Sequence, residues 1–303
     1  MIAVIYYAYG APKSVDEIGS YFSHIMNGKK VPEAMLGNIT SMFKQSGYPD
    51  FIRSSTERIA KGVTQVLQTK LSESVQVYPA YKHTAPFVND VYAQAVEAGA
   101  TKIVTLSVNP IKSATGGGAI HTEIAALNEG TSIEHIAIDD YHLDERIVAL
   151  YADRVSRAYE WLPASSREEG HVLFTVHSQP VDEERNAPYV AQFEQLAAAI
   201  ANKAGIKNFH ITYRSGRAAG WLGPDVKEAM RTLTEAGAKG FVTCELLSVT
   251  ADVESFVEIN KECKEVAKEL EVDFAVSEFL GDSFDTVFAL AELIESRLFV
   301  TAK

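Results

Sequence analysis

The sequence predicts an α/β fold of two similar Rossmann-like domains, each a four-stranded parallel sheet flanked by helices, with a cleft between them. Two observations favour this class: apolar runs alternate with stretches of helical period, and the second half of the chain repeats the spacing of the first. Such alternation is typical of parallel sheets covered by helices on both faces. The predicted strands are 2–8, 75–81, 102–108, 133–138, 171–176, 208–213, 240–247 and 272–276, and helical periodicity marks 57–70, 87–98, 146–161, 190–204 and 225–236.

An internal repeat indicates how the strands are grouped. The tetrapeptide Glu-Ala-Gly-Ala occurs at 97–100 and again at 235–238, and a lysine and a β-forming run follow each copy. The glutamate of each copy lies eleven residues after a proline, Pro86 or Pro224. Because proline fits the first turn of a helix and glycine fits its end, both copies predict helix, turn and strand. The repeat therefore favours two halves of four strands over one barrel or one wide sheet.

The predicted domains are residues 1–150 and 165–303. The boundary falls near 145–168, where Pro163 breaks a helix, and the last helix could pack back on the first half. In open α/β sheets, ligands bind at the carboxyl ends of the strands. We therefore expect the loops at those ends to line the cleft between the halves.

Composition excludes several classes of function. The chain has 303 residues and a formal net charge of −12, which argues against nucleic acid as a partner because its binders carry a basic face. Two cysteines, Cys244 and Cys263, are too few for an iron–sulfur cluster that needs four thiolates, and they indicate buried free thiols. No apolar run reaches the ~18–20 residues that cross a bilayer, and the start indicates a strand rather than a signal peptide. We expect a cytoplasmic protein without stable membrane insertion.

Two side chains occupy matching places at the ends of the first strands of the two halves. Tyr9 lies three residues before Pro12, and His177 lies three residues before Pro180. Ligand groups of α/β domains gather at such strand ends. A lone histidine there could equally make a structural hydrogen bond, so position alone leaves both interpretations of His177 open.

A row of carboxylates follows the strand at 240–247. Glu254, Glu258 and Glu262 are spaced four residues apart, with Asp252 just before them. On an α-helix this row would share one face with a drift of about 40° per step, and its like charges would repel one another. A divalent cation would suit the row, whereas a solvated acidic face is the alternative. Local widening towards π geometry would align the row better, which sequence cannot show.

Other candidate motifs are weaker. Trp221 lies between two glycines and before a helix-opening proline, where its indole could stack on a flat ligand or anchor the loop in the core. The glycine run 116–118 lacks the frame of a dinucleotide-binding or P-loop motif. Ser178 follows His177 without the G-x-S-x-G frame of a nucleophile elbow.

Five motifs in order resemble those of ferrochelatases, in particular the short, soluble Gram-positive type that acts on coproporphyrin. Each motif alone is weak, but the ordered set is specific and spans nearly the whole chain. The resemblance implies a chelatase-like fold of two four-stranded parallel α/β domains with a porphyrin cleft, in agreement with the repeat. The motifs are Ala8-Tyr9-Gly10-Ala11-Pro12, Lys82-His83-x-x-Pro86-Phe87, Val176-His177-Ser178-Gln179-Pro180, Trp221-Leu222-Gly223-Pro224-Asp225-Val226 and the row Glu254, Glu258 and Glu262.

The resemblance implies insertion of Fe²⁺ into a porphyrin in haem biosynthesis, with Fe²⁺ as a substrate and no required cofactor. His177 and Glu254 match the residues that face the metal, and Glu258 and Glu262 match an acidic row that passes metal inward. A neutral histidine can accept a porphyrin N–H proton or bind Fe²⁺. A carboxylate can share the metal and balance its charge.

The resemblance also implies a porphyrin side. Tyr9 matches a residue on the opposite face of the macrocycle, and Lys82, His83 and Trp221 match positions beside the porphyrin. Groups expected to hold the propionates are changed, and the departures stand at Met26, Asn27, Met42, Phe43, Asp50, Phe51, Ile52, Ile120, Gln179, Asp252 and Val253. Cations that remain for propionates are Lys29, Lys30, Arg53, Lys82, Arg214 and Arg217.

Three functions are compatible with the sequence. The first is a monomeric coproporphyrin III ferrochelatase whose partners are porphyrin and Fe²⁺. The second is a cobalt or nickel chelatase for a sirohydrochlorin-like tetrapyrrole, but such enzymes tend to use two metal-facing histidines and here Glu254 takes the second place. The third is a paralogue that binds haem or porphyrin without catalysis, with Tyr9 or His177 as the iron ligand.

Overall fold

A computed structural model describes residues 1–46, 51–113, 117–216 and 219–299. The chain divides into two compact units, Met1–Asp140 with Gly281–Lys303, and Tyr141–Leu280. The first unit therefore consists of two separate stretches of chain, and the second is continuous. Each unit contains one four-stranded parallel sheet.

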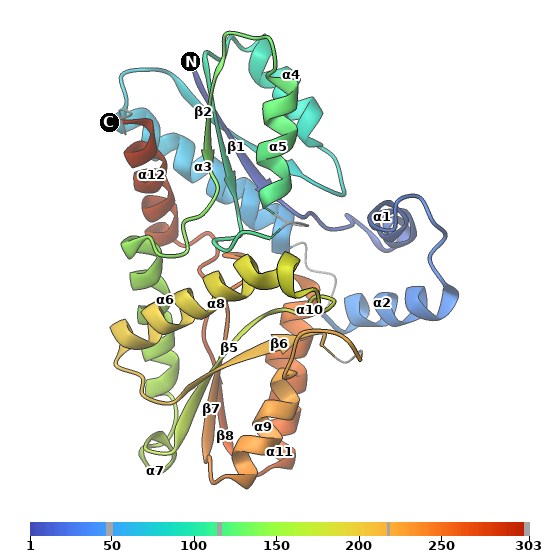
Figure 1. Ribbon diagram of the computed structural model, residues 1–303, viewed down its shortest axis with the longest axis vertical. Coiled ribbons are helices and arrows are strands. Elements are labelled where there is room, and N and C mark those ends of the chain that lie inside the picture. Colours follow the sequence, from blue (N-terminus) through green and yellow to red (C-terminus); the bar gives the residue numbers. More distant parts are fainter. Residues whose placement is uncertain (47–50, 114–116, 217–218, 300–303) are drawn as a thin grey trace. The chain divides into compact units, whose positions relative to one another are not determined.

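The first unit has the strand order β2-β1-β3-β4. All seven residues of its central strand β1 are buried, which fits an uninterrupted apolar run with helices on both faces. Figure 1 shows α3 and α12 together on one side of this sheet and α4 and α5 on the other. Its elements are β1 (Ile2–Ala8), η1 (Val15–Glu17), α1 (Ile18–Ile25), α2 (Glu33–Ser46), α3 (Phe51–Lys70), β2 (Val75–Tyr81), α4 (Val88–Glu97), β3 (Lys102–Ser107), α5 (Gly118–Leu127), β4 (Glu134–Ile138) and α12 (Phe284–Leu298).

The second unit repeats this order as β6-β5-β7-β8. Helices α6 and α8 pack on one face, and α9 and α11 pack on the other. The expected duplication of a four-stranded parallel α/β unit is confirmed. Its elements are α6 (Glu145–Glu160), α7 (Ala164–Arg167), β5 (Gly170–His177), α8 (Glu183–Ala204), β6 (Phe209–Arg214), α9 (Val226–Glu235), β7 (Gly240–Glu245), α10 (Val253–Ser255), η2 (Phe256–Glu262), α11 (Cys263–Glu269) and β8 (Asp273–Val276).

The division between the units differs from the predicted domain bounds. It falls at Asp140, before α6, whereas the sequence placed it near 145–168. Helix α6 packs on α8 and on β7 because its apolar stripe is buried in the second unit. Helix α12 packs on α3 of the first unit, where Gly62 lets Val287 approach its Cα closely. The residues after Leu280 thus complete the first unit rather than the second.

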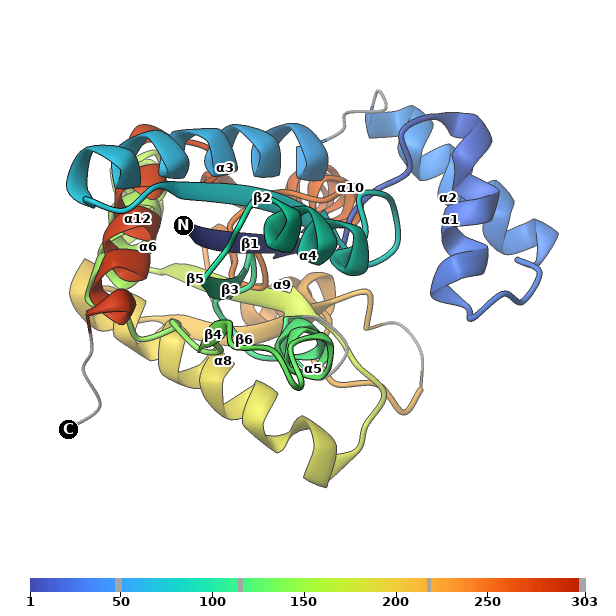
Figure 2. The same cartoon turned by 90° about the horizontal axis from the view of Figure 1, so that it is seen from above.

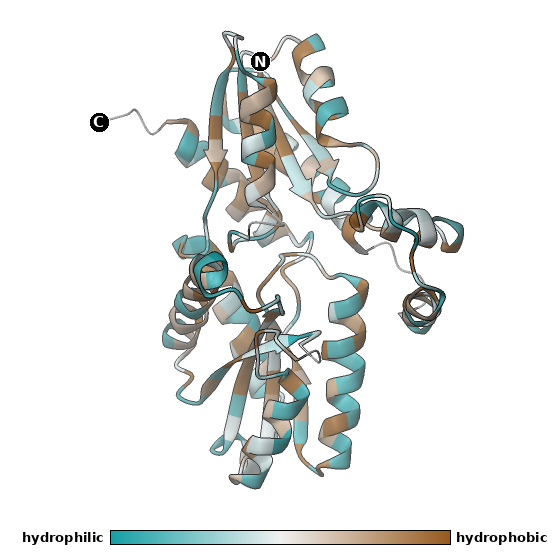
Figure 3. Ribbon diagram, turned by 45° about the vertical axis from the view of Figure 1, so that its right-hand side comes forward, coloured by the Kyte–Doolittle hydropathy of each residue, from teal (hydrophilic) through white to brown (hydrophobic). Residues whose placement is uncertain are grey.

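Each core lies between the sheet and its helices. On β1, alternate residues Ala3, Ile5 and Tyr7 pack against α4 and α5. On β5, Leu173 packs with residues of α9 and α11, including Cys263. Figure 3 shows hydrophobic residues concentrated along the strands and hydrophobic and hydrophilic residues mixed along the helices. This pattern is expected of amphipathic helices that cover a buried sheet.

The state of the two cysteines agrees with the expectation from the sequence. Cys244 and Cys263 are free and buried, and burial raises the pKa of each thiol to about 12. Along the described chain, no helix is long and apolar enough to cross a membrane. The helices α1 and α2, which were not among the predicted elements, lie apart from the sheet of their unit (Figure 2).

Candidate active site

The candidate site lies where the strand order of the second sheet reverses. Strand β5 pairs with β6 on one side and with β7 on the other, so the topological switch point lies at the carboxyl end of β5. His177 ends β5, Arg214 ends β6 and Glu245 ends β7. The register pairs His177 with Arg214, and Thr175 with Glu245. Paired residues of neighbouring strands point to the same face, so these four side chains share one face of the sheet.

Arg214 is the centre of a buried charge cluster. Its Nε lies 3.1 Å from Oε2 of Glu245, its Nη2 lies 2.7 Å from Oδ2 of Asp252, and its Nη1 lies 3.2 Å from Oε2 of Glu254. Burial lowers the pKa of Arg214, but Asp252, Glu245 and Glu254 together raise it above its ordinary value. Removing one partner of such a buried cluster costs about 3–5 kcal/mol, because the remaining charge is left uncompensated. Arg214 is therefore not available to a porphyrin propionate, although the sequence had left it among the candidates for that role.

His177 and Glu254 form a pair at the edge of this cluster. Nε2 of His177 lies 3.3 Å from Oε2 of Glu254. Burial lowers the pKa of His177, but its hydrogen bond to Glu254 and the charge of that carboxylate raise it overall. Burial raises the pKa of Glu254, and the hydrogen bond from His177 with the charges of His177 and Arg214 more than offset burial and lower it. At neutral pH Glu254 is thus a carboxylate, and the pair favours a proton on His177.

The hydrogen bond made by the other ring nitrogen, Nδ1, determines where His177 is protonated. Nδ1 of His177 makes a short hydrogen bond to the carbonyl oxygen of Ser178. A carbonyl can only accept, so Nδ1 carries a hydrogen and Nε2 is the nitrogen that gains or loses the proton. The backbone here is held by Tyr189, whose hydroxyl donates to the His177 carbonyl at 2.9 Å. The indole of Trp221 lies beside the imidazole, with a ring-centroid separation of 6.3 Å.

The acidic row lies on a helix that is locally widened to π geometry, the condition under which residues spaced by four align better than on an α-helix. Glu254 belongs to α10, whose N-cap is Asp252, and residues Phe256–Glu262 form the π-helix η2. A π turn takes more residues than an α turn, so it offsets the angular drift of residues spaced by four. Glu258 and Glu262 therefore stay near the line that Glu254 begins.

Like Glu254, which meets Arg214, the other two glutamates of the row already have cationic or hydrogen-bonding partners. The carboxylate of Glu258 accepts from the Oγ and N of Ser215 at 2.6 and 2.9 Å. Nζ of Lys227 lies 3.5 Å from Glu258 and 2.7 Å from Glu262. Among the described residues, no group of three or more histidine, cysteine, aspartate or glutamate side chains is arranged to hold a metal ion. The role of Glu258 and Glu262 in passing metal stays a prediction.

The residues of the first unit that were predicted to lie beside the porphyrin belong to a cluster of rings. Tyr9 is exposed directly after β1, its ring lies 4.5 Å from that of His83, and Nζ of Lys82 lies 5.8 Å from its ring centre. Nδ1 of His83 lies 2.9 Å from Nδ1 of His24. Sequence reasoning missed His24, because no motif marks it and only the fold of α1 brings it to His83. The ring of Phe87 stacks on His24.

The remaining propionate candidates have different surroundings. Lys29 and Lys30 are exposed, whereas the guanidinium of Arg53 lies over the ring of Tyr81 and donates to the carbonyl of Ala85 at 3.0 Å. Arg217, Asp50 and Gly116 lie outside the described residues. The side chain of Phe51 is also not described.

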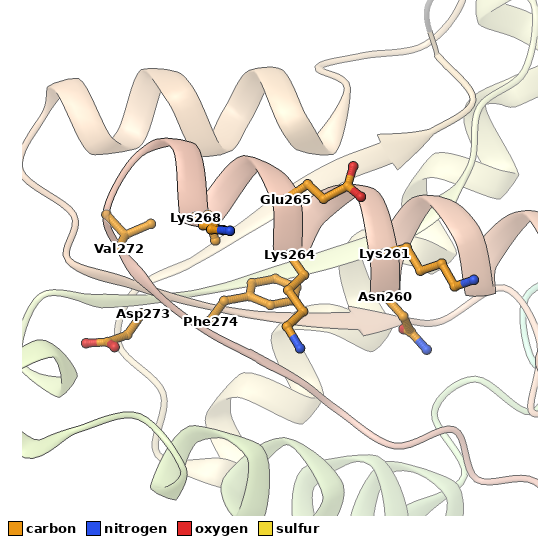
Figure 4. A pocket seen from close by; sticks show the side chains of 9 residues that line it. Asn260, Lys261, Lys264, Glu265, Lys268, Val272, Asp273 and Phe274 are labelled. Carbon is orange, nitrogen blue, oxygen red and sulfur yellow. The ribbon is translucent and has the colours of Figure 1, made fainter. Parts of the chain in front are cut away.

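A surface pocket lies elsewhere in the second unit. Its volume is about 670 Å³, and it is lined by η2, α11 and the start of β8. Figure 4 shows Lys261, Lys264 and Lys268 on the helical side of the pocket, with Phe274 opposite them. None of the residues that form the His177–Glu254 pair or the Arg214 cluster lines it. The pocket is therefore distinct from the candidate site at the strand ends.

The two four-stranded parallel sheets with their flanking helices define a chelatase-like α/β fold. SirB from Bacillus subtilis with Fe³⁺ matches with a TM-score of 0.59 and 15% identity, covering 98% of this chain and 95% of that one. CbiX, the terminal enzyme for biosynthesis of siroheme in denitrifying bacteria, matches with a TM-score of 0.52 and 13% identity, covering 97% and 98%. At such identities the likeness shows the shared fold.

The sequence assigns the family. A sequence model described as Ferrochelatase matches residues 1–298, and the chain belongs to the ferrochelatase family. It is 27% identical to a ferrochelatase of Deinococcus radiodurans over 98% of this chain and 96% of that protein. It is 28% identical to coproporphyrin III ferrochelatase 2 of Bacillus thuringiensis, covering 89% and 86%. The expected family and the expected class of metal-insertion enzyme are thereby confirmed.

Proposed function

We propose that this enzyme inserts Fe²⁺ into coproporphyrin III, with His177 and Glu254 as the residues that meet the metal. The observation that carries the proposal is the 3.3 Å pair of His177 Nε2 and Glu254 Oε2 at the switch point of the second sheet. Family membership and curated relatives named coproporphyrin III ferrochelatase support the substrate.

The chemistry requires two protons to leave the macrocycle as one Fe²⁺ enters it. The hydrogen on Nδ1 of His177 is held by Ser178, so Nε2 can accept one porphyrin proton when it is neutral, release it to solvent and then accept the second. The carboxylate of Glu254 provides negative charge for the ion and for the imidazolium that forms. The porphyrin supplies four nitrogen ligands to the ion. Two protein donors are therefore enough to deliver it, because the ion must then leave the protein for the porphyrin.

The metal preference follows from the donor types. Imidazole suits borderline divalent ions, and a carboxylate adds a harder oxygen donor, a combination that suits Fe²⁺. A second metal-facing histidine is replaced by Glu254, so the sirohydrochlorin alternative is less well supported. The solved SirB and CbiX structures share the fold at 13–15% identity and do not bear on the substrate.

The proposal includes a monomer in the cytoplasm. Size-exclusion chromatography coupled to light scattering tests the first part, for which one chain of 33.1 kDa is the expected mass. Cell fractionation with an antibody tests the second.

The deciding experiment is anaerobic Fe²⁺ insertion, with coproporphyrin III and protoporphyrin IX assayed side by side by loss of porphyrin fluorescence. The variants are His177→Ala and Glu254→Gln, and circular dichroism checks that both fold. We expect faster loss with coproporphyrin III and at least a ~100-fold slower rate in each variant, the scale of a lost acid–base group. Tight haem binding with no insertion by the wild type would instead support the non-catalytic paralogue. Insertion at the wild-type rate by both variants would refute the assigned residues.

A further inference from the structure

The Arg214 guanidinium uses three different nitrogens for three different carboxylates. Nε contacts Glu245, Nη2 contacts Asp252 and Nη1 contacts Glu254, at 3.1, 2.7 and 3.2 Å. The side chain is only 2% exposed. A planar guanidinium held in this way cannot rotate without breaking several ion pairs, unlike a lysine ammonium.

Two of the three carboxylates are themselves fixed. Glu245 accepts from the hydroxyl of Thr175 at 2.8 Å and has a side chain 3% exposed. Asp252 accepts from the backbone N–H of Ser255 at 2.7 Å and so caps α10. The guanidinium is therefore held from the sheet on one side and from the helix N-terminus on the other.

The third carboxylate is the one that faces the chemistry. Glu254 has a side chain 41% exposed, and its Oε2 is shared between Nη1 of Arg214 and Nε2 of His177. We infer that Arg214 is a positioning residue that holds the Glu254 carboxylate beside His177 in one orientation for the incoming divalent ion. This inference deepens the proposed function, on which it rests for the identity of the ion and of its acceptor.

Arg214 also sets the charge of the site. When His177 is neutral, one guanidinium against three carboxylates leaves two negative charges, which match one divalent cation. Removal of Arg214 alone cannot separate positioning from charge, because it would change both. It would also leave Glu245 buried without a counter-charge. A variant that keeps the net charge is needed to separate them.

The double variant Arg214→Gln with Glu245→Gln meets this need. It removes one positive and one negative charge, so the site keeps two negative charges while Glu254 loses its guanidinium partner. The matched control is Glu245→Gln, which lowers the negative charge by one and leaves the contacts of Arg214 with Asp252 and Glu254. Circular dichroism and porphyrin fluorescence quenching show whether each protein folds and binds porphyrin.

Co²⁺ without porphyrin is the first probe, with its dissociation constant measured by isothermal titration calorimetry. The expected result is a ~10–100-fold weaker affinity in the double variant, the range measured for groups that orient metal ligands, and a smaller change in the control. In Fe²⁺ insertion, the KM for the metal rises while the KM for porphyrin stays constant. Wild-type Co²⁺ affinity in the double variant would overturn the inference.

A mutant cycle tests whether Arg214 acts through Glu254. In a Glu254→Gln background, the Arg214→Gln and Glu245→Gln changes should weaken Co²⁺ binding no further, because the group they position is already neutral. An equal further loss in that background would overturn the inference.

If the double variant does not fold, Asp252→Asn replaces it, since asparagine keeps the Oδ1 cap of Ser255 and removes the charge that holds Arg214. This variant should weaken Co²⁺ binding only when Glu254 is present. The Co²⁺ data stand even if the wild type inserts no iron, a result that would refute the proposed function alone.

Discussion

Lys227 places its ammonium 2.7 Å from the carboxylate of Glu262, and the same ammonium lies 3.5 Å from Glu258. Burial lowers the pKa of Lys227, but its hydrogen bond to Glu262 and the nearby acidic charges raise it overall. An internal cation therefore balances Glu258 and Glu262, the part of the acidic row where the family resemblance implies passage of metal.

Replacing Lys227 by methionine should convert this part of the row into a divalent-cation site. The two carboxylates would lose their counter-charge while the chain length of the side chain stays similar, so we expect one additional Mn²⁺ bound per chain in equilibrium titrations followed by electron paramagnetic resonance. Lys264→Met is the matched control. Lys264 is exposed on α11, so this substitution removes the same charge at a place away from the row. Equal Mn²⁺ stoichiometry in both variants would contradict the prediction.

The His177–Glu254 pair should make stability depend on pH on both sides of a window. The pKa of His177 is raised from 6.5, so its contribution is complete below 6.5 and is lost as pH rises through the higher value of the folded state. The pKa of Glu254 is lowered from 4.5, so its contribution is complete above 4.5 and is lost as pH falls below that value. The difference in unfolding free energy between wild type and Glu254→Gln should therefore be greatest between pH 4.5 and 6.5. Urea unfolding at pH 3, 5.5 and 9 measures it, and a difference independent of pH would contradict the pairing.

His83 should remain neutral through the physiological range. Burial, Lys82 and His24 lower the pKa of His83 from 6.5 to about 4. In the folded state His83 thus binds fewer protons than in the unfolded state between these two values, and stability should rise with pH from about 4 to 6.5. Two-dimensional NMR of the imidazole nitrogens should give a midpoint near 4, and His24→Ala should move it upward. A midpoint near 6.5 in the wild type would disprove the assigned environment.

Gly62 should resist replacement by alanine although it lies within a helix. A Cβ at Gly62 would lie 2.9 Å from Cγ1 and 3.2 Å from Cγ2 of Val287, whose β-branched side chain has little freedom to move. Alanine gains about 1 kcal/mol in helix propensity, and overpacking costs about 1–3 kcal/mol, so we expect a net loss of about 1 kcal/mol. Urea unfolding measures this loss, and Val287→Ala should remove the overpacking in a double variant. Gly37→Ala is the control, because nothing lies within 4 Å of its Cβ and alanine should stabilise α2 there. Stabilisation by Gly62→Ala would contradict the close packing.

The sequence predicted the sheets well because buried parallel strands form uninterrupted apolar runs. The spacing of the repeat also placed His177 at a strand end, and the ordered motifs indicated the family. The contacts of Arg214 could not be recognised in this way, since its three carboxylates belong to β7 and to α10 with its N-cap, which only the fold brings to the end of β6. The widened helix η2 could not be predicted either, because its local sequence permits both α and π geometry and packing decides between them.

The boundary between the units was the least predictable feature. A helix such as α6 has one apolar stripe, and sequence shows that the stripe must be buried without showing against which neighbour. For α12 the sequence allowed packing back on the first half, and the helix does pack there, on α3, which lies more than 200 residues earlier in the chain. Contacts over such separations leave no local pattern in the sequence, so the helix that α12 would meet could not be named.

The interrupted first unit has a consequence for synthesis on the ribosome. Domains generally fold as the chain emerges, from the N-terminus onward. Here α12, which covers one side of the first sheet together with α3, emerges only after all of Tyr141–Leu280 has been made. The second unit can therefore reach its native state while the first still exposes the apolar face of α3 that awaits its last helix. Stalled or shortened nascent chains that lack α12 should hence be the species that depends most on chaperones.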